Sequence, residues 1–336
     1  MTSRAMRTDD QDGFDRPRRH SRPRTKDRPD YSEAELGMII TVDRGRFRTL
    51  IDDREVTATK ARQLGRTGVI VGDQVRIVGD TSGDEGTLAR IVAVEDRRTV
   101  LRRTADDDDP YERPIVANAD QLVIVTALAD PPPRIGMIDR ILVAGFDAHI
   151  APLLCLTKAD LASPEALIAQ YEPLGVPVEA VAPDSDLDAL RARLSGRRSV
   201  FVGHSGVGKS TLVNALIPGA LRAIGEVNEV TGRGRHTSST AIALRLPPFA
   251  GGDEGAGGGS GWVIDTPGVR SFGLSHVSRD RIIAAFDDLA VITENCPRGC
   301  SHEADAPECA LDVAVDLREL DPARLESFRR MLGSGQ

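Results

Sequence analysis

One short loop motif constrains the fold of this 336-residue chain more than any other part of its sequence. Gly203-His204-Ser205-Gly206-Val207-Gly208-Lys209-Ser210 satisfies every fixed position of the pattern G-x-x-x-x-G-K-[ST]. The apolar run SVFV stands before it and the amphipathic run STLVNALI after it, which predicts a buried strand, a phosphate-binding loop and a helix. We therefore expect an α/β P-loop domain at this point of the chain, rather than a chance glycine-rich turn.

The chemistry expected of this loop is the binding of a nucleoside triphosphate. Its glycines allow backbone N–H groups to curl around phosphate oxygens, and the helix that follows begins with partial positive charge. We expect Lys209 to reach the β- and γ-phosphates and the Ser210 hydroxyl to ligate Mg²⁺. The residues assigned to nucleotide contact are Gly203, His204, Ser205, Gly206, Val207, Gly208, Lys209, Ser210 and Thr211.

The choice of base is indicated by Thr157-Lys158-Ala159-Asp160, at the end of the apolar run PLLCL. The Asp160 carboxylate can accept hydrogen bonds from guanine N1–H and N2–H₂, a donor pair that adenine lacks, and the Lys158 stem can lie against the base. Alone, this pattern could be a polar turn between a strand and a helix. Together with a phosphate loop it predicts that Thr157, Lys158 and Asp160 bind guanine.

A third motif, Asp265-Thr266-Pro267-Gly268, follows the run WVI. Asp265 can hold Mg²⁺ through water, and Gly268 can offer its N–H to the γ-phosphate. This short pattern is common by chance, but the three motifs together are specific for a GTPase. Their order is permuted: the guanine motif comes first here, whereas Ras-like GTPases place it last. Moving the chain ends leaves a site intact where the original termini lie close together.

The water-activating residue is harder to identify, because Val269 stands where Ras-like enzymes carry a glutamine. A valine cannot orient water. The loop GRGRHTSST at 232–240 supplies His236 as the nearest polar candidate for catalysis, although a loop histidine can also be merely solvated. In the same loop Thr237 is our first candidate for contact with Mg²⁺ and the γ-phosphate, and Thr240 the second. The expected catalytic set is His236, Lys209 and Thr237.

Three of the four cysteines fall in one short segment. The spacing Cys296-x3-Cys300-x-His302-x6-Cys309 offers three thiolates and one imidazole, which predicts one closed, structural Zn²⁺ site rather than three unrelated cysteines. Cys155 lies in an apolar run and is expected in the core.

Changes in composition and in the hydrophobic pattern divide the sequence into four parts. Residues 1–34 predict a disordered tail and residues 35–105 an all-β OB-fold barrel that binds RNA, with a boundary at the acidic run 106–109. Residues 110–275 predict the permuted GTPase domain and 276–336 an α-helical zinc-binding domain. Arg46 and Arg48 share one strand face of the barrel. The region has few aromatic residues for base stacking, of which Phe47 is the clearest, so contacts with the RNA backbone or its shape are expected rather than reading of single-stranded bases.

Composition supports a soluble, cytoplasmic protein, expected to be a monomer without a membrane partner. The chain is 40% hydrophobic and 28% charged, with a formal net charge of -8. Apolar runs of the length that spans a membrane are absent, and the polar N-terminus lacks the apolar region of a secretory signal.

The motifs GHSGVGKSTLVNAL, GRGRHTSS and DTPGVRSFGL, with the Cys/His cluster, resemble the ribosome small subunit-dependent GTPase A family of bacteria over roughly residues 35–332. The resemblance implies an OB-fold, a permuted GTPase domain and a zinc-binding helical domain. It also implies late assembly of the small (30S) subunit, contact with 16S rRNA, subunit-stimulated hydrolysis of GTP to GDP, and a catalytic role for His236. Two departures are the x3 spacing of the first cysteine pair and Ala182 where the family usually has serine.

Two alternative functions remain open at this point. The chain could act on the large subunit or another RNA, although a barrel before the GTPase motifs and a zinc cluster after them argue against this. It could also be a nucleotide-switched RNA-binding zinc protein without significant catalysis, against which Lys209, Ser210 and Asp265 argue.

Overall fold

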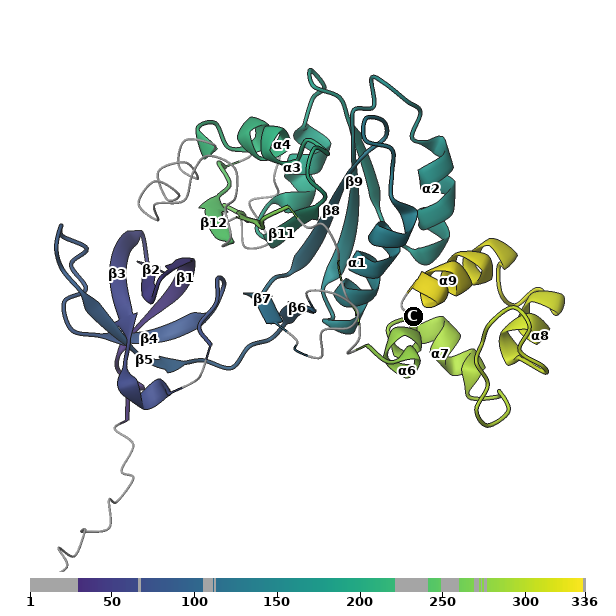
Figure 1. The fold of residues 1–336 in the computed structure, drawn as a ribbon, viewed down its shortest axis with the longest axis horizontal. Helices are drawn as coiled ribbons and strands as arrows, with labels where there is room; N and C mark the ends of the chain where they lie inside the picture. The colour runs from purple at the N-terminus through teal and green to yellow at the C-terminus, as the bar shows by residue number, and fades with distance from the viewer. Residues whose placement is uncertain are drawn as a thin grey trace, which may run out of the picture.

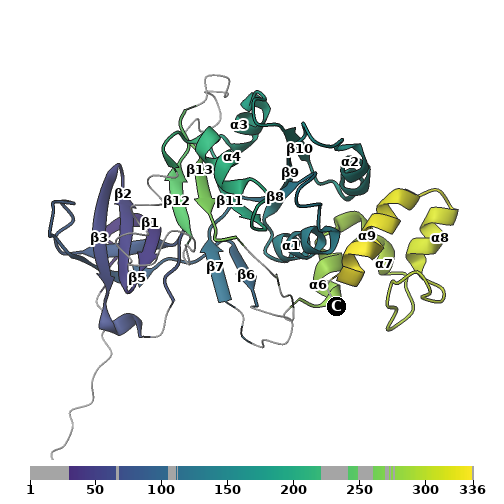
Figure 2. The same ribbon diagram turned by 45° about the horizontal axis from the view of Figure 1, so that its top comes forward.

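The computed structural model describes residues 30–65, 68–104, 111, 113–220, 241–248, 260–268, 272, 274 and 277–334. Most of the predicted tail (1–29) and the glycine-rich segment 249–259 lie outside these residues. The middle of the molecule is a parallel sheet (Figure 1) in the order β10-β9-β8-β11-β13, with β12 antiparallel beside β13 (Figure 2). These strands are β8 (Gln121–Ala127), β9 (Ala151–Thr157), β10 (Val178–Val181), β11 (Arg198–Gly203), β12 (Ile242–Arg245) and β13 (Trp262–Asp265).

Alternating side chains of the parallel strands build two separate cores. Leu122 and Ile124 of β8 face one core, and Val123 and Val125 face the other because successive side chains in a strand point to opposite faces. The near-continuous apolar strands of the sequence are therefore buried on both sides, as expected of a parallel sheet. The first face is covered by α1 (Ile135–Asp147) and α2 (Glu165–Tyr171), and the second by α3 (Asp188–Leu194) and α4 (Lys209–Leu216).

The N-terminal part is a closed five-stranded barrel, in agreement with the predicted OB-fold. Its strand order is β1-β2-β3-β5-β4, and β4 pairs back with β1. Ile39, Ile77 and Ile91 are fully buried at its centre. The short helix η1 (Arg62–Leu64) precedes β4. The strands are β1 (Glu35–Asp43), β2 (Arg46–Ile51), β3 (Arg54–Lys60), β4 (Gln74–Val78) and β5 (Ala89–Val94).

The barrel is joined to the central sheet by backbone contacts in two places. Strand β1 pairs with the edge strand β12 at Thr41 and Ile242, so a single eleven-stranded sheet runs through both parts (Figure 2). At the second place, the loop after η1 meets a hairpin of β6 (Val100–Arg103) and β7 (Arg113–Ala117), where Val71 bridges Val116.

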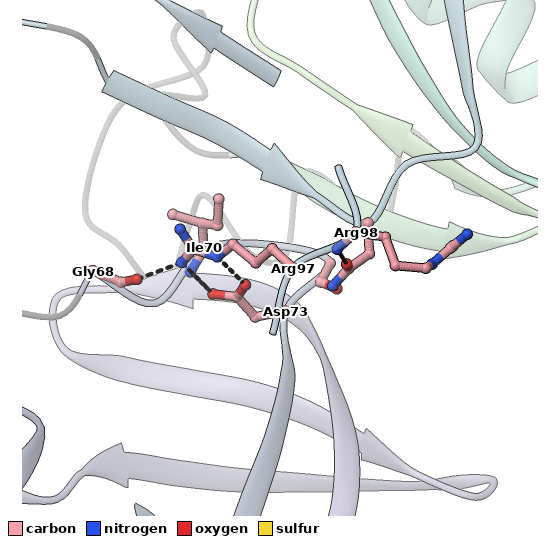
Figure 3. Close-up of polar contacts among 7 residues, drawn as sticks. Gly68, Ile70, Asp73, Arg97 and Arg98 are labelled. Carbon is pink, nitrogen blue, oxygen red and sulfur yellow. Dashed lines mark hydrogen bonds and ion pairs between the residues drawn. The ribbon is translucent and has the colours of Figure 1, made fainter. Parts of the chain in front are cut away.

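A buried ion pair holds the loop that makes the second contact (Figure 3). The Asp73 carboxylate is fully buried, accepts two bonds from the Arg97 guanidinium at 2.7 and 2.8 Å, and accepts the N–H of Ile70 at 2.8 Å. Arg97 also donates to the carbonyl of Gly68 at 2.6 Å. The neighbouring Gly72 must be glycine, because its φ is +90° and an added Cβ would lie 2.0 Å from the Ala117 carbonyl oxygen.

The C-terminal part is helical, as expected, and packs on the α1 face of the sheet (Figure 1). Its last helix contacts α1 and α2 through Asp139, which is buried and accepts bonds from Tyr171 at 2.9 Å and Arg330 at 3.2 Å. Of the helices that the structure describes, none combines the length and apolar character that a membrane crossing requires. The helices here are α6 (Arg279–Ala284), α7 (Asp287–Thr293), α8 (Ala310–Asp316) and α9 (Pro322–Ser334), while η2 (Glu172–Leu174) extends α2.

Two neighbouring arginines test the importance of the buried pair. Arg97→Met leaves the Asp73 charge uncompensated in the interior, so we expect a loss of about 3 kcal/mol in the free energy of unfolding. Arg98→Met removes only the exposed pair with Asp120 and should cost less than about 1 kcal/mol. Urea unfolding followed by the fluorescence of Trp262, the single tryptophan, measures both. Equal effects of the two substitutions would contradict the assignment.

Candidate nucleotide site and metal cluster

The three nucleotide motifs meet at one edge of the parallel sheet. Thr157 ends β9, Gly203 ends β11 and Asp265 ends β13. Because parallel strands point the same way, their carboxyl ends lie together, and this edge is where open α/β sheets bind ligands. The permuted order of the motifs along the chain therefore does not separate them in space.

The backbone of the phosphate loop requires its glycines. Gly206 and Gly208 have φ values of 86° and 87°, in the left-handed region that favours glycine. A Cβ on Gly203 would lie 2.5 Å from the carbonyl oxygen of Val125 on the adjacent strand. Helix α4 begins directly after this turn at Lys209. The loop N–H groups and the helix N-terminus together form an arrangement that suits phosphate oxygens.

Lys209 and Asp265, which the sequence assigned to phosphate and to Mg²⁺, are in direct contact. The Lys209 ammonium donates to the Asp265 carboxylate and to the Thr266 carbonyl, and both charged side chains are nearly buried. Thr266 is in turn fixed by a 2.7 Å bond from its hydroxyl to the Phe201 carbonyl. Ser210 is exposed on the first turn of α4. The Ser210 hydroxyl and the Asp265 carboxylate both offer oxygen atoms, which are the ligands that Mg²⁺ prefers.

Thr157 connects the guanine motif to the phosphate loop. Its buried hydroxyl donates to the Val207 carbonyl at 2.5 Å and lies 3.3 Å from the Thr126 carbonyl. Gly208 passes against the same side chain, and an added Cβ there would lie 3.6 Å from the Thr157 hydroxyl oxygen. From the sequence, Thr157 was expected to contact the base only. The hydrogen bond to Val207 could not be predicted from the sequence, because its acceptor is a backbone carbonyl, which every residue carries.

The other residues of the guanine motif are also held by contacts with backbone atoms. Lys158 has a left-handed φ of 59°, and its ammonium donates to the Asp130 carbonyl. The N–H of Ala159 donates to the Val181 carbonyl at 3.2 Å, which ties the motif to the end of β10. Asp160 is exposed, so its carboxylate can accept bonds from a base.

The remaining nucleotide and catalytic candidates fall partly outside the described residues. His236, Thr237 and Thr240 belong to 221–240, and Val269 lies just beyond 260–268, so the structure places none of these four. Their roles stay predictions. Gly268 is described, and its Cα faces the loop, since an added Cβ would lie 3.5 Å from the Ser205 nitrogen.

The predicted zinc residues lie together in the C-terminal part. The ligand atoms of Cys296, Cys300, His302 and Cys309 are all within 4.8 Å of one another. The Nδ1 atom of His302 lies 3.6 Å from the Cys296 sulfur and 3.8 Å from the Cys309 sulfur. A tetrahedral zinc with ordinary Zn–S and Zn–N distances needs S···N separations of about 3.6 Å. The four side chains therefore fit a structural Zn²⁺ site through Nδ1.

The surroundings of this cluster orient its ligands. The N–H of Ala310 donates to the Cys296 sulfur at 3.3 Å, and Arg329 donates to the His302 carbonyl at 3.0 Å while pairing with Asp312. Burial lowers the pKa of His302, which favours the neutral imidazole that a metal requires. Burial also raises the pKa of the Cys296 thiol to about 11, so metal binding at that sulfur must displace a proton.

The Thr157 bridge can be tested by removing only its hydroxyl. Thr157→Val keeps the shape but leaves the buried Val207 carbonyl without this donor, so we expect GDP affinity to fall about tenfold. Thr157→Ser keeps the hydroxyl and should bind GDP nearly as the parent does. Titration with a fluorescent GDP derivative measures both, and unchanged affinity in Thr157→Val would show that the bridge does not shape the site.

The metal cluster can be tested with two cysteine substitutions. Cys309→Ser should lower the zinc content of the purified protein well below one ion per chain and lower the melting temperature, because a closed site contributes to folding. Cys155→Ala should retain full zinc content, since Cys155 is buried in β9. Metal analysis by mass spectrometry decides, and full zinc content in Cys309→Ser would exclude this ligand.

Comparison with known proteins agrees with this arrangement. A small ribosomal subunit biogenesis GTPase RsgA from Pseudomonas aeruginosa (strain LESB58) is 42% identical over 275 residues, covering 79% of this chain and 76% of that protein. The protein of the same name from Pseudomonas fluorescens (strain SBW25) is 40% identical over 318 residues, covering 91% and 87%.

Two solved structures have a similar fold. YjeQ from Thermotoga maritima aligns with a TM-score of 0.63 at 23% identity, over 90% of this chain and 98% of its own. YloQ, described as a circularly permuted GTPase, aligns with a TM-score of 0.61 at 23% identity, over 91% and 96%. The pattern of the RsgA GTPase family matches residues 94–275, which include all three nucleotide motifs. With the permuted motifs gathered at one sheet edge and relatives this similar over most of their length, the chain belongs to the RsgA GTPase family.

Proposed function

We propose that this protein is a GTPase that binds the small (30S) ribosomal subunit and acts late in its assembly, hydrolysing GTP to GDP and phosphate. The observation that carries the proposal is the contact of the three motifs, through Lys209 with Asp265 and Thr157 with Val207. The family and the names of its relatives supply the biological setting.

The residues of the site divide the chemistry among them. The loop N–H groups and Lys209 stabilise the negative charge that develops on the phosphate oxygens during in-line attack by water. Ser210 and Asp265, with Thr237, would hold Mg²⁺, which would neutralise phosphate charge. Val269 cannot orient the attacking water, and we assign that role to His236. The structural Zn²⁺ belongs to Cys296, Cys300, His302 and Cys309.

The barrel is the proposed contact with 16S rRNA. Arg46 and Arg48 are exposed on β2, whereas Phe47 between them is buried in the barrel core. Phe47 is thus removed from base stacking. Arg46 is placed for contacts with the RNA backbone, and Arg48, which pairs with Glu55 at 2.6 Å, would have to exchange that carboxylate for a phosphate. The protein is proposed to work as a cytoplasmic monomer.

The decisive experiment compares GTP turnover alone, with purified small subunits and with purified large subunits. We expect low intrinsic turnover, strong stimulation by small subunits only, and co-sedimentation with them in the presence of a GTP analogue. His236→Ala should lose most of the stimulated rate while it retains GDP affinity, because the change spares the phosphate loop and the guanine motif. Equal turnover with and without small subunits would refute the proposal, and normal stimulation of His236→Ala would refute the role of that histidine.

A further inference from the structure

The chain that leaves the Asp265 motif is fixed in the interior of the protein soon after it passes the phosphate loop. Gly268 lies against that loop, since an added Cβ would be 3.5 Å from the Ser205 nitrogen. Four positions later Phe272 is fully buried, and Leu274 is buried as well. Both belong to the core that α1 shares with the C-terminal helices, so they anchor this part of the chain.

One side chain of α1 binds the backbone at this anchor. The Arg140 guanidinium is half-buried and donates to the Phe272 carbonyl at 3.2 Å. The carbonyl of a buried residue needs a donor, and a donor that carries a charge makes the stronger hydrogen bond. Arg140 therefore fixes a backbone atom of the anchor, in addition to the side chains that pack around it.

The segment that leads into α1 is held against the nucleotide motifs. The Pro131 ring packs on Gly206, where an added Cβ would lie 3.8 Å from the proline Cδ, and the Asp130 carbonyl accepts the Lys158 ammonium. A cavity of about 20 Å³ between the helix and the phosphate loop has room for about one water molecule. Its walls include Met137, Ile138 and Ile141 on the helix side and Gly203, His204 and Val207 on the loop side. Movement of α1 relative to the loop would break these contacts.

Buried polar contacts also hold α1 from the side of the C-terminal helices. Asp139, the residue before Arg140, accepts a bond from Arg330 of α9 at 3.2 Å. At the end of the helix, Asp147 pairs with Arg281 of α6 at 2.7 Å. Both carboxylates are nearly buried, so breaking either pair would leave an uncompensated charge in the interior. Helix α1 is thus a fixed support, and Arg140 has a defined place on it.

We propose that Arg140 is a positioning residue for GTP hydrolysis. Gly268 can offer its N–H to the γ-phosphate, and a chain of four residues spans at most about 14 Å. By holding the Phe272 carbonyl, Arg140 limits where Gly268 can lie relative to the phosphate loop, to which α1 is itself attached. This inference rests on the proposed function, because it concerns the residues that hold the γ-phosphate of GTP.

The proposed role predicts an effect on GTP and none on GDP. GDP has no γ-phosphate, so its contacts with the phosphate loop and the guanine motif do not depend on the position of Gly268. A general loss of folded protein would instead weaken the binding of both nucleotides equally. The ratio of the two affinities therefore separates positioning from stability.

The first test replaces Arg140 by methionine, which keeps most of the side-chain length but has no N–H donor. For Arg140→Met we expect the affinity for a non-hydrolysable GTP analogue to fall about tenfold, the effect of one lost hydrogen bond to a charged group, while the affinity for GDP is unchanged. Fluorescent derivatives of both nucleotides report the two affinities. An unchanged ratio, or an equal loss of both nucleotides, would overturn the proposal.

Two further variants show whether the hydrogen bond itself matters. Arg281→Met removes an arginine that supports α1 through Asp147 rather than through Phe272, so it should lower the melting temperature but leave the affinity ratio unchanged. Arg140→Lys keeps a charged donor and should recover most of the lost affinity for the GTP analogue. If Arg281→Met changes the ratio as strongly as Arg140→Met, or if Arg140→Lys is equally impaired, the contact with Phe272 is not the cause and the assignment fails.

Turnover measured with saturating GTP and small subunits separates this inference from the proposed function. Arg140→Met should show a lower kcat than the parent, because Gly268 is no longer held in place for the γ-phosphate. If small subunits do not stimulate the parent, the proposed function fails, and the affinity ratio still tests Arg140. If the parent is stimulated and Arg140→Met has the same kcat and the same affinity ratio, the proposed function stands and the role of Arg140 is refuted.

Discussion

The common direction of five strands is the constraint on which the nucleotide site depends. In a parallel sheet every strand delivers its carboxyl end to the same edge, and here β9, β11 and β13 deliver the guanine motif, the phosphate loop and the Asp265 motif. The order of these strands along the chain does not change which edge their carboxyl ends share. The local contacts then complete the site, as Thr157 binds Val207 and Lys209 binds Asp265 across strands that are far apart in sequence.

Permutation does change what is attached to the nucleotide-responsive segments. Strand β12, which follows 221–240, is the strand that pairs with β1 of the barrel. The segment after Gly268 leads into α6 and the helices around the metal cluster. Each flanking part is thus connected to one of the two segments expected to respond to the γ-phosphate. A movement of either segment can be transmitted through backbone pairing on one side and chain continuity on the other.

Much of this architecture could be predicted because its signals are local. Gly206 and Gly208 occupy positions with positive φ that favour glycine, and the apolar runs of β8 and β9 are buried on both faces. The spacing of Cys296 to Cys309 likewise brought four ligand atoms together. What could not be predicted depends on backbone atoms and on distant pairing. The acceptors of Thr157 and Lys158 are carbonyls, and the β1–β12 pairing joins residues about two hundred positions apart.

Phe47, and the pair of Arg103 and Arg113, show that residue type alone does not predict where a side chain lies or what it faces. Phe47 has the chemistry of a base-stacking residue, but the alternation along β2 turns it into the barrel core and leaves Arg46 and Arg48 outside. Arg103 and Arg113 are ordinary charged residues in the sequence, and only the antiparallel register sets them opposite each other.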